Sequence, residues 1–567
     1  MASLSEPEHI FRSSLPAAAI PNVTVPEYIL LNAIRPEDEH RVAVVDASDE
    51  RQYTYGQTRI LVKNVAAGLR NLLGIRKGDV VFVLLPNTAE YFILVLGIMW
   101  AGGVYSGGNP YAHPGEIEKQ IQDSEAKVVV TDSTYFEKVK QFAHQLPILL
   151  TPVSSAAPTD KSVTPNPEGS TSVQRLLEYD GSEYVPPEPI SQDDLCALPY
   201  SSGTTGLSKG VKLTHRNLLA NTTRTCPIPA VPPTPAQLAS VKRYVVLGLL
   251  PFFHIYGTTG ICCSTMRYQG TLVVLPRYDL RLMLAALIKY EVTFTPLVPP
   301  IILQMVKSPI VNEFDLSKLK LEGVMTAAAP LPPDIQKAFE ARFPGVELRQ
   351  AYGLTEYSCI TLSHVPLGYP RGNAKKGSVG FLIPGTEMKI LDPDTGKSLP
   401  ANRAGEICVR GESTMNGYFK NEEATAATID EQGWLHTGDV GYIDDDGDVF
   451  IVERAKELIK YKGFQVPPAE LEAILVAHPL IADAAVIPIP DDEAGELPAA
   501  CVVLAPNSHL NEEDVIRYVG AKVASYKKVR HVEFVSSIPK SLSGKTLRRV
   551  LKDDILKRLK KTENQLI

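Results

Sequence analysis

Cysteine is scarce in this sequence: the chain has seven cysteines among 567 residues, an odd and scattered set. No Cys-x-x-Cys pair occurs, and no cysteines and histidines follow the spacing of a zinc-binding motif. A chain of this length buries enough apolar surface to fold without disulfide or metal crosslinks. We therefore predict a reduced, intracellular protein without a structural zinc site.

A basic excess is also missing, because the formal net charge is −7 at pH 7. Proteins that bind nucleic acids are usually basic, so this class is disfavoured. Long apolar runs are missing as well. The uncharged stretch 91–105 is shorter than the ~20 residues of a membrane span, and the stretch 244–266 is interrupted by Pro251 and His254. We expect both to be buried core, with no transmembrane segment and no nucleic-acid partner.

Targeting signals are missing from both ends of the sequence. The opening residues lack the basic and apolar regions of a secretory signal peptide. The last three residues, Gln565-Leu566-Ile567, differ from the peroxisomal Ser-Lys-Leu type of signal. We therefore expect a cytoplasmic protein.

Helical and strand-like patterns alternate through the first 360 residues, which predicts an α/β fold with a parallel sheet and helices on its faces. Residues 151–190 are rich in Pro, Ser and Thr and are expected to form a surface loop. The periodicity predicts buried strands at 80–85 and 126–131, and helices at 56–73, 89–102 and 134–145.

The pattern changes at residue 377 to short strands separated by Gly and Asp-Gly turns, which predicts antiparallel structure up to about 454. The acidic run 444–448 has the wrong spacing for an EF-hand, and Asp446-Gly447 is typical of a hairpin turn.

A third pattern follows, with a strand pair, a helix from Pro467-Pro468, two more strands and a basic terminal helix. We predict an N-terminal domain at 1–454, a hinge at 455–456 and a C-terminal domain at 457–567. The terminal helix is expected to bury one apolar face made of Leu547, Val550, Leu551, Ile555, Leu556 and Leu559.

The strongest local signal is YSSGTTGLSKG at 200–210, between expected strands at 195–199 and 210–213. Its glycines let backbone N–H groups approach a phosphate closely, its hydroxyls are further donors, and Lys209 adds a positive charge. The run is not a Walker A loop, because Ser208 stands where that pattern needs glycine. A flexible Ser/Gly linker is the alternative, but such linkers seldom lie between two strands.

This loop resembles the signature loop of the adenylate-forming superfamily, which comprises acyl- and aryl-CoA synthetases, peptide-synthetase adenylation domains and beetle luciferases. The whole length resembles plant 4-coumarate–CoA ligase and its relatives. The resemblance implies a large N-terminal domain with parallel-sheet subdomains and a small barrel-like β subdomain, then a small mobile α+β domain. Five more motifs match in order and spacing: PFFHIY at 251–256, YGLTE at 352–356, GWLHTGD at 433–439, ERAKELIKYKG at 453–463 and PKSLSGK at 539–545.

The resemblance also implies the nucleotide site. Asp439 would accept hydrogen bonds from the ribose hydroxyls. Glu356 would bind Mg²⁺, with the hydroxyl of Thr204 or Thr205 as a further ligand. The residues that would bind ATP or AMP are Ser201, Ser202, Gly203, Thr204, Thr205, Lys209, Gln350, Ala351, Thr355, Asp439, Arg454, Lys456, Gln465 and Lys545.

Four residues would carry the chemistry. Lys545 resembles the lysine that enters the site for adenylation, where a carboxylate attacks the α-phosphate and an ammonium stabilises the developing charge. Lys456 sits at the hinge, and Lys460 lies on the face expected to meet coenzyme A after the small domain rotates. His254 would lie near the acyl carboxylate.

Coenzyme A would be bound by Arg277, Lys462 and Gly463. Residues 521–567 contain 13 Lys or Arg against 4 Asp or Glu, which is either a patch for the phosphates of the coenzyme or an ordinary basic helix.

The acyl pocket departs from cinnamate-type ligases. Met325 stands where they carry lysine, Ala327 and Ala351 where they carry glycine, and Gly260 where they carry serine. Loss of polar partners would leave a phenolic hydroxyl unpaired, which costs ~1–3 kcal/mol. Gly257, Gly260 and Met325 would form an apolar, adaptable channel for an aliphatic chain. The expected acyl-binding residues are His254, Tyr256, Gly260, Met325, Ala327, Ala351 and Tyr352.

The segments FFHIYGTTGICC, VMTAAAPL and AYGLTEYSCITLSH resemble anther-specific acyl-CoA synthetases more than 4-coumarate–CoA ligases. Those synthetases supply medium- and long-chain, often hydroxylated, fatty acyl-CoA for sporopollenin, the pollen-wall polymer. That implies peripheral association with the endoplasmic reticulum and with polyketide-synthase-type enzymes. The alternatives are a hydroxycinnamate–CoA ligase, a luciferase-like oxygenase and a catalytically silent nucleotide-binding scaffold. An amino-acid adenylation domain is disfavoured, because residues 244–270 contain no Asp or Glu for a substrate ammonium.

Overall fold

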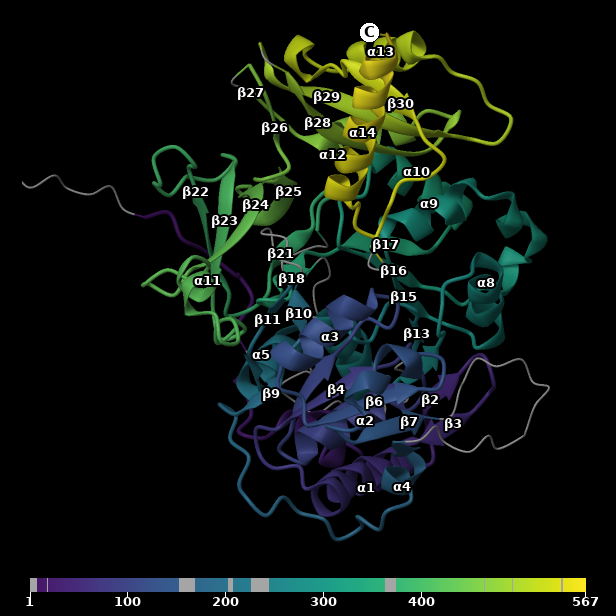
Figure 1. The fold of residues 1–567 in the computed structure, drawn as a ribbon, viewed down its shortest axis with the longest axis vertical. Coiled ribbons are helices and arrows are strands. Elements are labelled where there is room, and N and C mark those ends of the chain that lie inside the picture. Colours follow the sequence, from purple (N-terminus) through teal and green to yellow (C-terminus); the bar gives the residue numbers. More distant parts are fainter. Residues whose placement is uncertain are drawn as a thin grey trace, which may run out of the picture.

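The computed structural model describes residues 8–17, 19–151, 169–201, 208–225, 244–362, 374–462, 464–491, 493–541 and 544–566. Within these residues the chain forms two largely parallel sheets, an antiparallel sheet that curls into a nearly closed barrel-like layer, and a separate C-terminal sheet (Figure 1). The predicted fold class is confirmed.

The first parallel sheet carries helices on its faces. Its strand order is β12 (Leu213–Thr214), β9 (Leu195–Ala197), β5 (Val104–Gly107), β4 (Val80–Leu84), β6 (Val128–Asp132), β7 (Ile148–Thr151), β8 (Ser170–Ser172). Its helices are α1 (Tyr55–Leu73), α2 (Tyr91–Trp100), α3 (Pro114–Asp123) and α4 (Gln174–Leu177). A capping box between Thr54 and Gln57 starts α1, and Gly74 ends it at φ +70°.

The second parallel sheet supports most of the candidate site. Its order is β17 (Glu347–Gln350), β16 (Gly323–Thr326), β15 (Phe294–Leu297), β13 (Val245–Gly248), β14 (Thr271–Val274), β2 (Val42–Asp46), β3 (Gln52–Thr54). The surrounding helices are α5 (His215–Thr225), the π-helical η5 (Tyr256–Cys263), α7 (Ser264–Arg267), α8 (Leu280–Lys289), α9 (Pro299–Lys307) and α10 (Pro333–Arg342).

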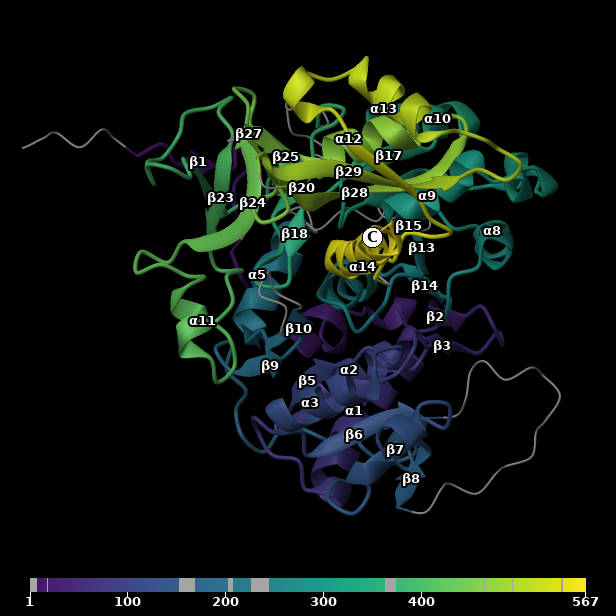
Figure 2. The same cartoon turned by 45° about the horizontal axis from the view of Figure 1, so that its top comes forward.

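The antiparallel sheet and the C-terminal sheet lie next to each other (Figures 1 and 2). The antiparallel order is β1 (Phe11–Arg12), β22 (Glu387–Leu391), β23 (Gly405–Arg410), β24 (Leu435–Ile443), β25 (Asp448–Arg454), β21 (Gly380–Leu382), β20 (Thr361–Leu362), with α11 (Glu422–Ala426) beside it. The C-terminal sheet contains β27 (Phe464–Val466), β26 (Ile459–Tyr461), β29 (Gly495–Leu504), β28 (Ile481–Asp491) and β30 (His531–Phe534), with helices α12 (Pro468–Val476), α13 (Glu512–Gly520) and α14 (Arg548–Leu566).

The acidic run 444–448 forms the predicted turn, with Gly447 at φ +81° and Lys375 paired to Asp444 and Asp446. In the first uncharged stretch, residues 91–99 are all buried, as expected. In the second, 244–266, most residues are buried but His254 is exposed, so this stretch is core only in part. No helix among the described residues is long and apolar enough to cross a membrane.

Three expectations for local structure were wrong. Residues 134–145 form two short 3₁₀ turns instead of a helix, because Phe136, Val139 and Phe142 recur every third residue and all three are buried. The loop expected at 151–190 contains β8 and α4, while 152–168 lie outside the described residues. In α14 the face lies on β28 with Leu551 and Ile555 buried and Leu556 half-buried, whereas Leu547 and Val550 are 38% and 56% exposed; the side chain of Leu559 lies outside the described part of the helix.

Candidate active site

The two ends of the predicted phosphate loop form a small hairpin. Strands β10 (Tyr200–Ser201) and β11 (Lys209–Gly210) pair so that Ser201 lies opposite Lys209. Glu356 Oε1 accepts a hydrogen bond from Ser201 at 2.8 Å and another from Tyr418 at 2.9 Å. Lys209 Nζ lies 4.9 Å from the centre of the Tyr418 ring. The loop ends are therefore fixed beside Glu356. The predicted residues Ser202, Gly203, Thr204 and Thr205 lie outside the described residues.

A second hairpin positions Glu356. Strands β18 (Gly353–Leu354) and β19 (Ser358–Cys359) pair antiparallel, which leaves Thr355 and Glu356 in the turn. Thr355 is half-buried and Glu356 is buried. The backbone N–H of Met415 donates to the Glu356 carbonyl at 2.9 Å. The YGLTE motif thus joins the phosphate loop to the antiparallel sheet.

A bulge in β24 aims Asp439. In the β23–β24 pairing, Cys408 lies opposite His436 and Glu406 lies opposite Val440, so residues 437–439 face Ile407 alone. Gly438 has φ +69°, a left-handed conformation that glycine adopts without strain. Such bulges re-aim side chains next to functional sites.

The Asp439 carboxylate lies between two partners. Tyr352 donates to Oδ2 at 2.5 Å, and Arg454 Nε lies 3.6 Å from Oδ1. Burial raises the pKa of Asp439, and the charge of Arg454 and the hydrogen bond from Tyr352 partly offset this. Burial and the neighbouring carboxylate raise the pKa of Tyr352 well above its usual value, so its hydroxyl remains a donor. The structure thus joins the YGLTE motif, Asp439 and the hinge.

Gln350 and Ala351 end β17 next to these groups. Gln350 Oε1 accepts a hydrogen bond from the Leu331 backbone at 3.2 Å, and the Ala351 N–H donates to the Thr326 carbonyl at 2.9 Å. Both side chains are largely buried, with 7% and 8% exposure. The 326–331 segment is thereby held beside the end of β17.

Lys545 approaches the Asp439 cluster from the C-terminal domain. Its N–H donates to Ser541 Oγ at 3.1 Å. Gly544, at φ +78°, packs so tightly on the N-terminal domain that an added Cβ would lie 2.8 Å from Val298 Cγ2. Burial lowers the pKa of Lys545 and Arg454 lowers it further, while the carboxylates of Glu457 and Asp439 oppose the shift. Lys545 is therefore electrostatically coupled to the Asp439 cluster.

Two contacts cross the predicted hinge at 455–456. Glu453 Oε2 accepts the N–H of Ala469 at 2.9 Å, so a carboxylate of β25 caps the first turn of α12. At the other end of α12, Lys307 Nζ donates to the carbonyls of Val476 and Ile481 at 2.8 and 2.7 Å. Both ends of one small-domain helix are thus held by the N-terminal domain.

Arg548 lies among three carboxylates near the hinge and offsets part of their charge. Its guanidinium pairs with Glu457 and lies 2.7 Å from Glu472 Oε2. Burial lowers the pKa of Arg548, but Glu472, Glu453 and Glu457 outweigh this and raise it, so the guanidinium stays charged.

The predicted coenzyme A face lies apart from Lys545. Lys460, Lys462 and Gln465 are exposed on the β26–β27 hairpin, and Lys456 is exposed in the preceding turn. The Lys460 N–H donates to Glu496 Oε2 at 2.9 Å, and Lys462 pairs with Glu493. Gly463 lies outside the described residues, and Arg277 is exposed just after β14.

His254 and Tyr256 lie at the start of η5, which contacts β19 of the YGLTE hairpin. The His254 side chain is exposed to solvent; partial desolvation lowers its pKa, and the charge of Glu356 opposes the shift. The imidazole is therefore neutral at neutral pH.

The space beside the two pocket glycines is filled. A Cβ on Gly257 would lie 2.0 Å from the Pro251 carbonyl oxygen, and one on Gly260 would lie 2.5 Å from the Tyr256 ring. Gly257 is thus required by backbone packing, and Gly260 makes room for Tyr256 rather than for an open channel. Met325 and Ala327 are half-buried at the end of β16, while the intervening Thr326 is fully buried.

Four residues around the site were missed in the sequence: Lys307, Tyr418, Glu453 and Arg548. Glu453 lies inside a matched motif and Arg548 follows another, so their positions were a usable signal. Lys307 and Tyr418 gave none, because their roles arise from contacts 169 and 62 residues away.

Comparisons with known proteins agree with this arrangement. The family model described as AMP-binding enzyme matches residues 34–419, and the AMP-binding enzyme C-terminal domain matches residues 470–545. The chain therefore belongs to the AMP-binding enzyme family. Within that family it falls in the plant 4-coumarate–CoA ligase-like group, and it is an AMP-forming acid–CoA ligase.

The chain is 55% identical to 4-coumarate–CoA ligase-like 1 of Arabidopsis thaliana over 97% of both chains. It is 41% identical to 4-coumarate–CoA ligase 1 of Petroselinum crispum over 96% of both. The crystal structure of ATP-bound MatB from Rhodopseudomonas palustris superimposes with a TM-score of 0.79 at 26% identity, covering 94% of this chain and 99% of that one. An acid, ATP and coenzyme A are the substrates that these likenesses support.

Proposed function

We propose that the protein activates medium- or long-chain fatty acids, including hydroxylated ones, and supplies the acyl-CoA for pollen-wall sporopollenin. The observation that carries the proposal is Met325. It is half-buried at the carboxyl end of β16, where cinnamate-type ligases carry lysine. The higher identity to a ligase-like protein (55%) than to a 4-coumarate–CoA ligase (41%) also supports a separate substrate class.

In the proposed reaction Mg-ATP binds between the phosphate loop, the YGLTE hairpin and Asp439. Asp439 would accept hydrogen bonds from the ribose hydroxyls, which would partly replace its hydrogen bond from Tyr352. Glu356 suits Mg²⁺, because this ion commonly binds through one carboxylate, substrate phosphates and water. The ion would neutralise phosphate charge, while Ser201 and Tyr418 fix the carboxylate through Oε1.

Adenylation follows in the observed orientation of the domains. The fatty carboxylate attacks the α-phosphate, the bond to pyrophosphate breaks, and the Lys545 ammonium stabilises the charge that develops. In this proposal neutral His254 lies near the acyl carboxylate. Its neighbour Glu356 accepts a hydrogen bond from Ser201 of the phosphate loop, so His254 lies on the same side of the site as the phosphates.

Thioester formation then requires a second orientation. The C-terminal domain, 457–567, rotates about the hinge at 455–456 and withdraws Lys545. Lys460, Lys462 and Gly463 move toward coenzyme A, whose thiolate attacks the acyl carbonyl and displaces AMP. We place the enzyme in the cytoplasm, peripherally at the endoplasmic reticulum, beside polyketide-synthase-type enzymes that consume its product.

Substrate competition tests this proposal. We expect a higher kcat/KM for hydroxylated lauric or palmitic acid than for 4-coumarate. Met325→Lys would place a charge among apolar groups and should reduce fatty-acid kcat/KM at least tenfold, whereas Met325→Leu, with similar volume, should change it less than about threefold. A preference for 4-coumarate would favour the hydroxycinnamate ligase instead. An unchanged KM for long chains in Met325→Lys would remove Met325 from the pocket.

A further inference from the structure

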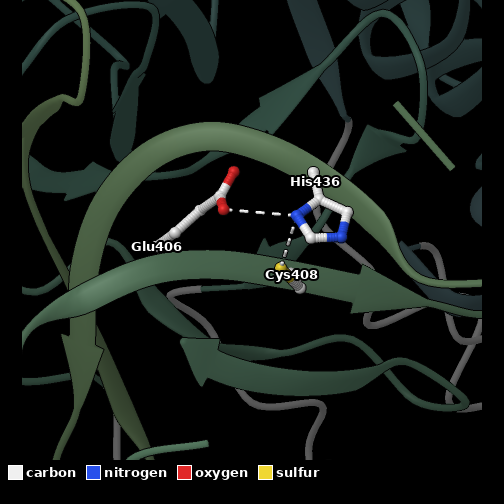
Figure 3. A group of neighbouring side chains, drawn as sticks. All are labelled: Glu406, Cys408 and His436. Atoms are coloured by element: carbon white, nitrogen blue, oxygen red, sulfur yellow. Dashed lines mark hydrogen bonds and ion pairs between the residues drawn. The ribbon is translucent and has the colours of Figure 1, made fainter. Parts of the chain in front are cut away.

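Strands β23 and β24 bring together three side chains of metal-ligand type that the reaction does not use. Glu406 and Cys408 come from β23, and His436 comes from β24 (Figure 3). Cys408 and His436 are direct cross-strand partners, so they share one face of the sheet. Glu406 is two residues from Cys408 along the strand and lies on the same face.

The distances match those around a tetrahedral zinc ion. His436 Nδ1 lies 3.5 Å from Cys408 Sγ and 3.2 Å from Glu406 Oε2. With Zn–S, Zn–N and Zn–O bonds of usual length, tetrahedral ligands lie about 3.6 Å (S to N) and about 3.3 Å (N to O) apart. All three ligand atoms lie within 4.8 Å of one another.

A second carboxylate supports the imidazole. Asp430 Oδ2 lies 3.7 Å from His436 Nε2, on the side of the ring away from Cys408. This is an ion-pair distance; at zinc sites a carboxylate that accepts the N–H of the second ring nitrogen fixes the ring orientation, and Asp430 is the carboxylate placed to take that role. Glu406 is itself oriented, because its Oε1 accepts the Gly438 N–H at 3.3 Å.

The surrounding charges suit a divalent cation. Lys389 lies opposite Cys408 on β22, with its Nζ 3.9 Å from Asp430, 3.7 Å from Glu8 and 4.6 Å from the centre of the Trp434 ring. With a Cys408 thiolate, Glu8, Glu406 and Asp430 would bring the negative charge to four. A divalent ion and the Lys389 ammonium would supply three positive charges, which offset most of it.

We propose that Glu406, Cys408 and His436 form a zinc site, with water as the fourth ligand. The thiolate and imidazole favour Zn²⁺ over Mg²⁺ or Ca²⁺, which prefer oxygen ligands. Binding breaks the S–H bond of Cys408, releases that proton to solvent and forms an S–Zn bond. Cys408 is buried while Glu406 and His436 are partly exposed, so the ion can enter from the side of these two residues.

The site goes beyond the acyl-CoA reaction but lies on its scaffold. His436 is three residues from Asp439, and Glu406 bonds the bulge that aims Asp439. The zinc ion would therefore fix the register of β23 and β24 at the bulge. The proposal departs from the sequence-based prediction of no structural zinc site, because strand pairing, and not sequence spacing, brings residues 408 and 436 together.

Zinc titration of the full chain tests the proposal. Metal-stripped protein in millimolar Mg²⁺ should bind one Zn²⁺ with a micromolar or lower Kd by calorimetry. Co²⁺ substitution should give a thiolate-to-metal charge-transfer band. Cys408→Ser and His436→Asn should each weaken Zn²⁺ binding at least tenfold, and Asp430→Asn about tenfold. The band should disappear in Cys408→Ser.

His531→Asn is the matched control. His531 also lies between two carboxylates, 3.7 Å from Glu512 and 2.8 Å from Glu533, but no thiol among the described residues forms a hydrogen bond with it. The His531→Asn variant should bind Zn²⁺ with the same affinity as the wild type. Equal Zn²⁺ affinity in wild type and Cys408→Ser, or a Co²⁺ complex without the thiolate band, would overturn the proposal. Circular dichroism would show whether each variant is folded. If Cys408→Ser does not fold, the Zn²⁺ affinity of His436→Asn alone tests the proposal.

Discussion

Two lysines of the C-terminal domain lie in opposite surroundings. Lys545 is half-buried against the N-terminal domain, and burial lowers its pKa. Lys462 is exposed at the β26–β27 turn, and its hydrogen bond with Glu493 raises its pKa. One lysine is desolvated beside the Asp439 cluster, while the other is paired in solvent.

The difference shows which step this arrangement favours. The cross-domain contacts made by Gly544, Glu453 and Lys307 all belong to the orientation in which Lys545 approaches Asp439. A desolvated ammonium stabilises developing phosphate charge more strongly than a solvated one. We therefore interpret this orientation as the adenylating one.

The largest effect is expected from Lys545→Met. Losing the ammonium should remove about 2–4 kcal/mol of transition-state stabilisation and slow ATP–pyrophosphate exchange by roughly 30- to 1,000-fold. Thioester formation from synthetic acyl-adenylate should stay near the wild-type rate, because the proposed rotation withdraws Lys545 before that step.

Lys460→Met is its matched counterpart. Exchange should be largely kept, while thioester formation from acyl-adenylate is impaired. Equal loss of both half-reactions in both variants would show that the lysines are structural or that the domain does not alternate.

Lys307→Met should give the next largest effect. It removes one hydrogen bond to the last residue of α12 and one to the first residue of β28, and should destabilise the observed orientation by about 1–2 kcal/mol. Exchange should slow about 5- to 30-fold, with thioester formation from acyl-adenylate kept. Lys289→Met, which removes an exposed pair with Glu50 inside the N-terminal domain, should leave both rates unchanged. An equal slowing of both half-reactions would mean that Lys307 stabilises the fold generally.

The pKa of Lys545 predicts a pH dependence. The pKa of an ordinary lysine is about 10.4. Because the pKa of Lys545 is lowered, its ammonium loses its proton at a lower pH than that. The exchange rate should therefore fall as pH rises, and the fall should begin below about pH 10.4. One pH unit above the pKa of Lys545 in the folded protein, the rate should be about tenfold lower. Lys545→Arg should remove this alkaline limb, even if its rate is lower, because guanidinium stays charged. If the exchange rate of Lys545→Arg falls at alkaline pH as it does in the wild type, the fall belongs to another titrating group.

The sequence predicted the scaffold better than the connections within it. Motif residues such as Asp439, Glu356 and Lys545 could be located because their spacing matches a known family. Their partners could not, since Tyr418 reaches Glu356, and Lys307 reaches α12, only after the sheets have assembled. The bulge at Gly438 was equally hidden, because a bulge is a property of two paired strands. Gly257 and Gly260 suggested an open channel because they lack side chains, but Pro251 and Tyr256 fill the space beside them.

The smallest effect is expected on the exposed side of the comparison. Glu493→Gln removes the carboxylate that pairs with Lys462, and exposed ion pairs contribute little to stability. Exchange should be unchanged, because Lys545 is untouched. If Lys462 meets the phosphates of coenzyme A, freeing its ammonium should lower the KM for coenzyme A by about two- to threefold at low salt, with less effect at high salt. Asp446→Asn, which weakens an exposed pair with Lys375 in the N-terminal domain, is the control and should leave this KM unaltered. A KM for coenzyme A that does not respond to Glu493→Gln at any salt concentration would remove Lys462 from the coenzyme face and leave Lys460 as its principal basic residue.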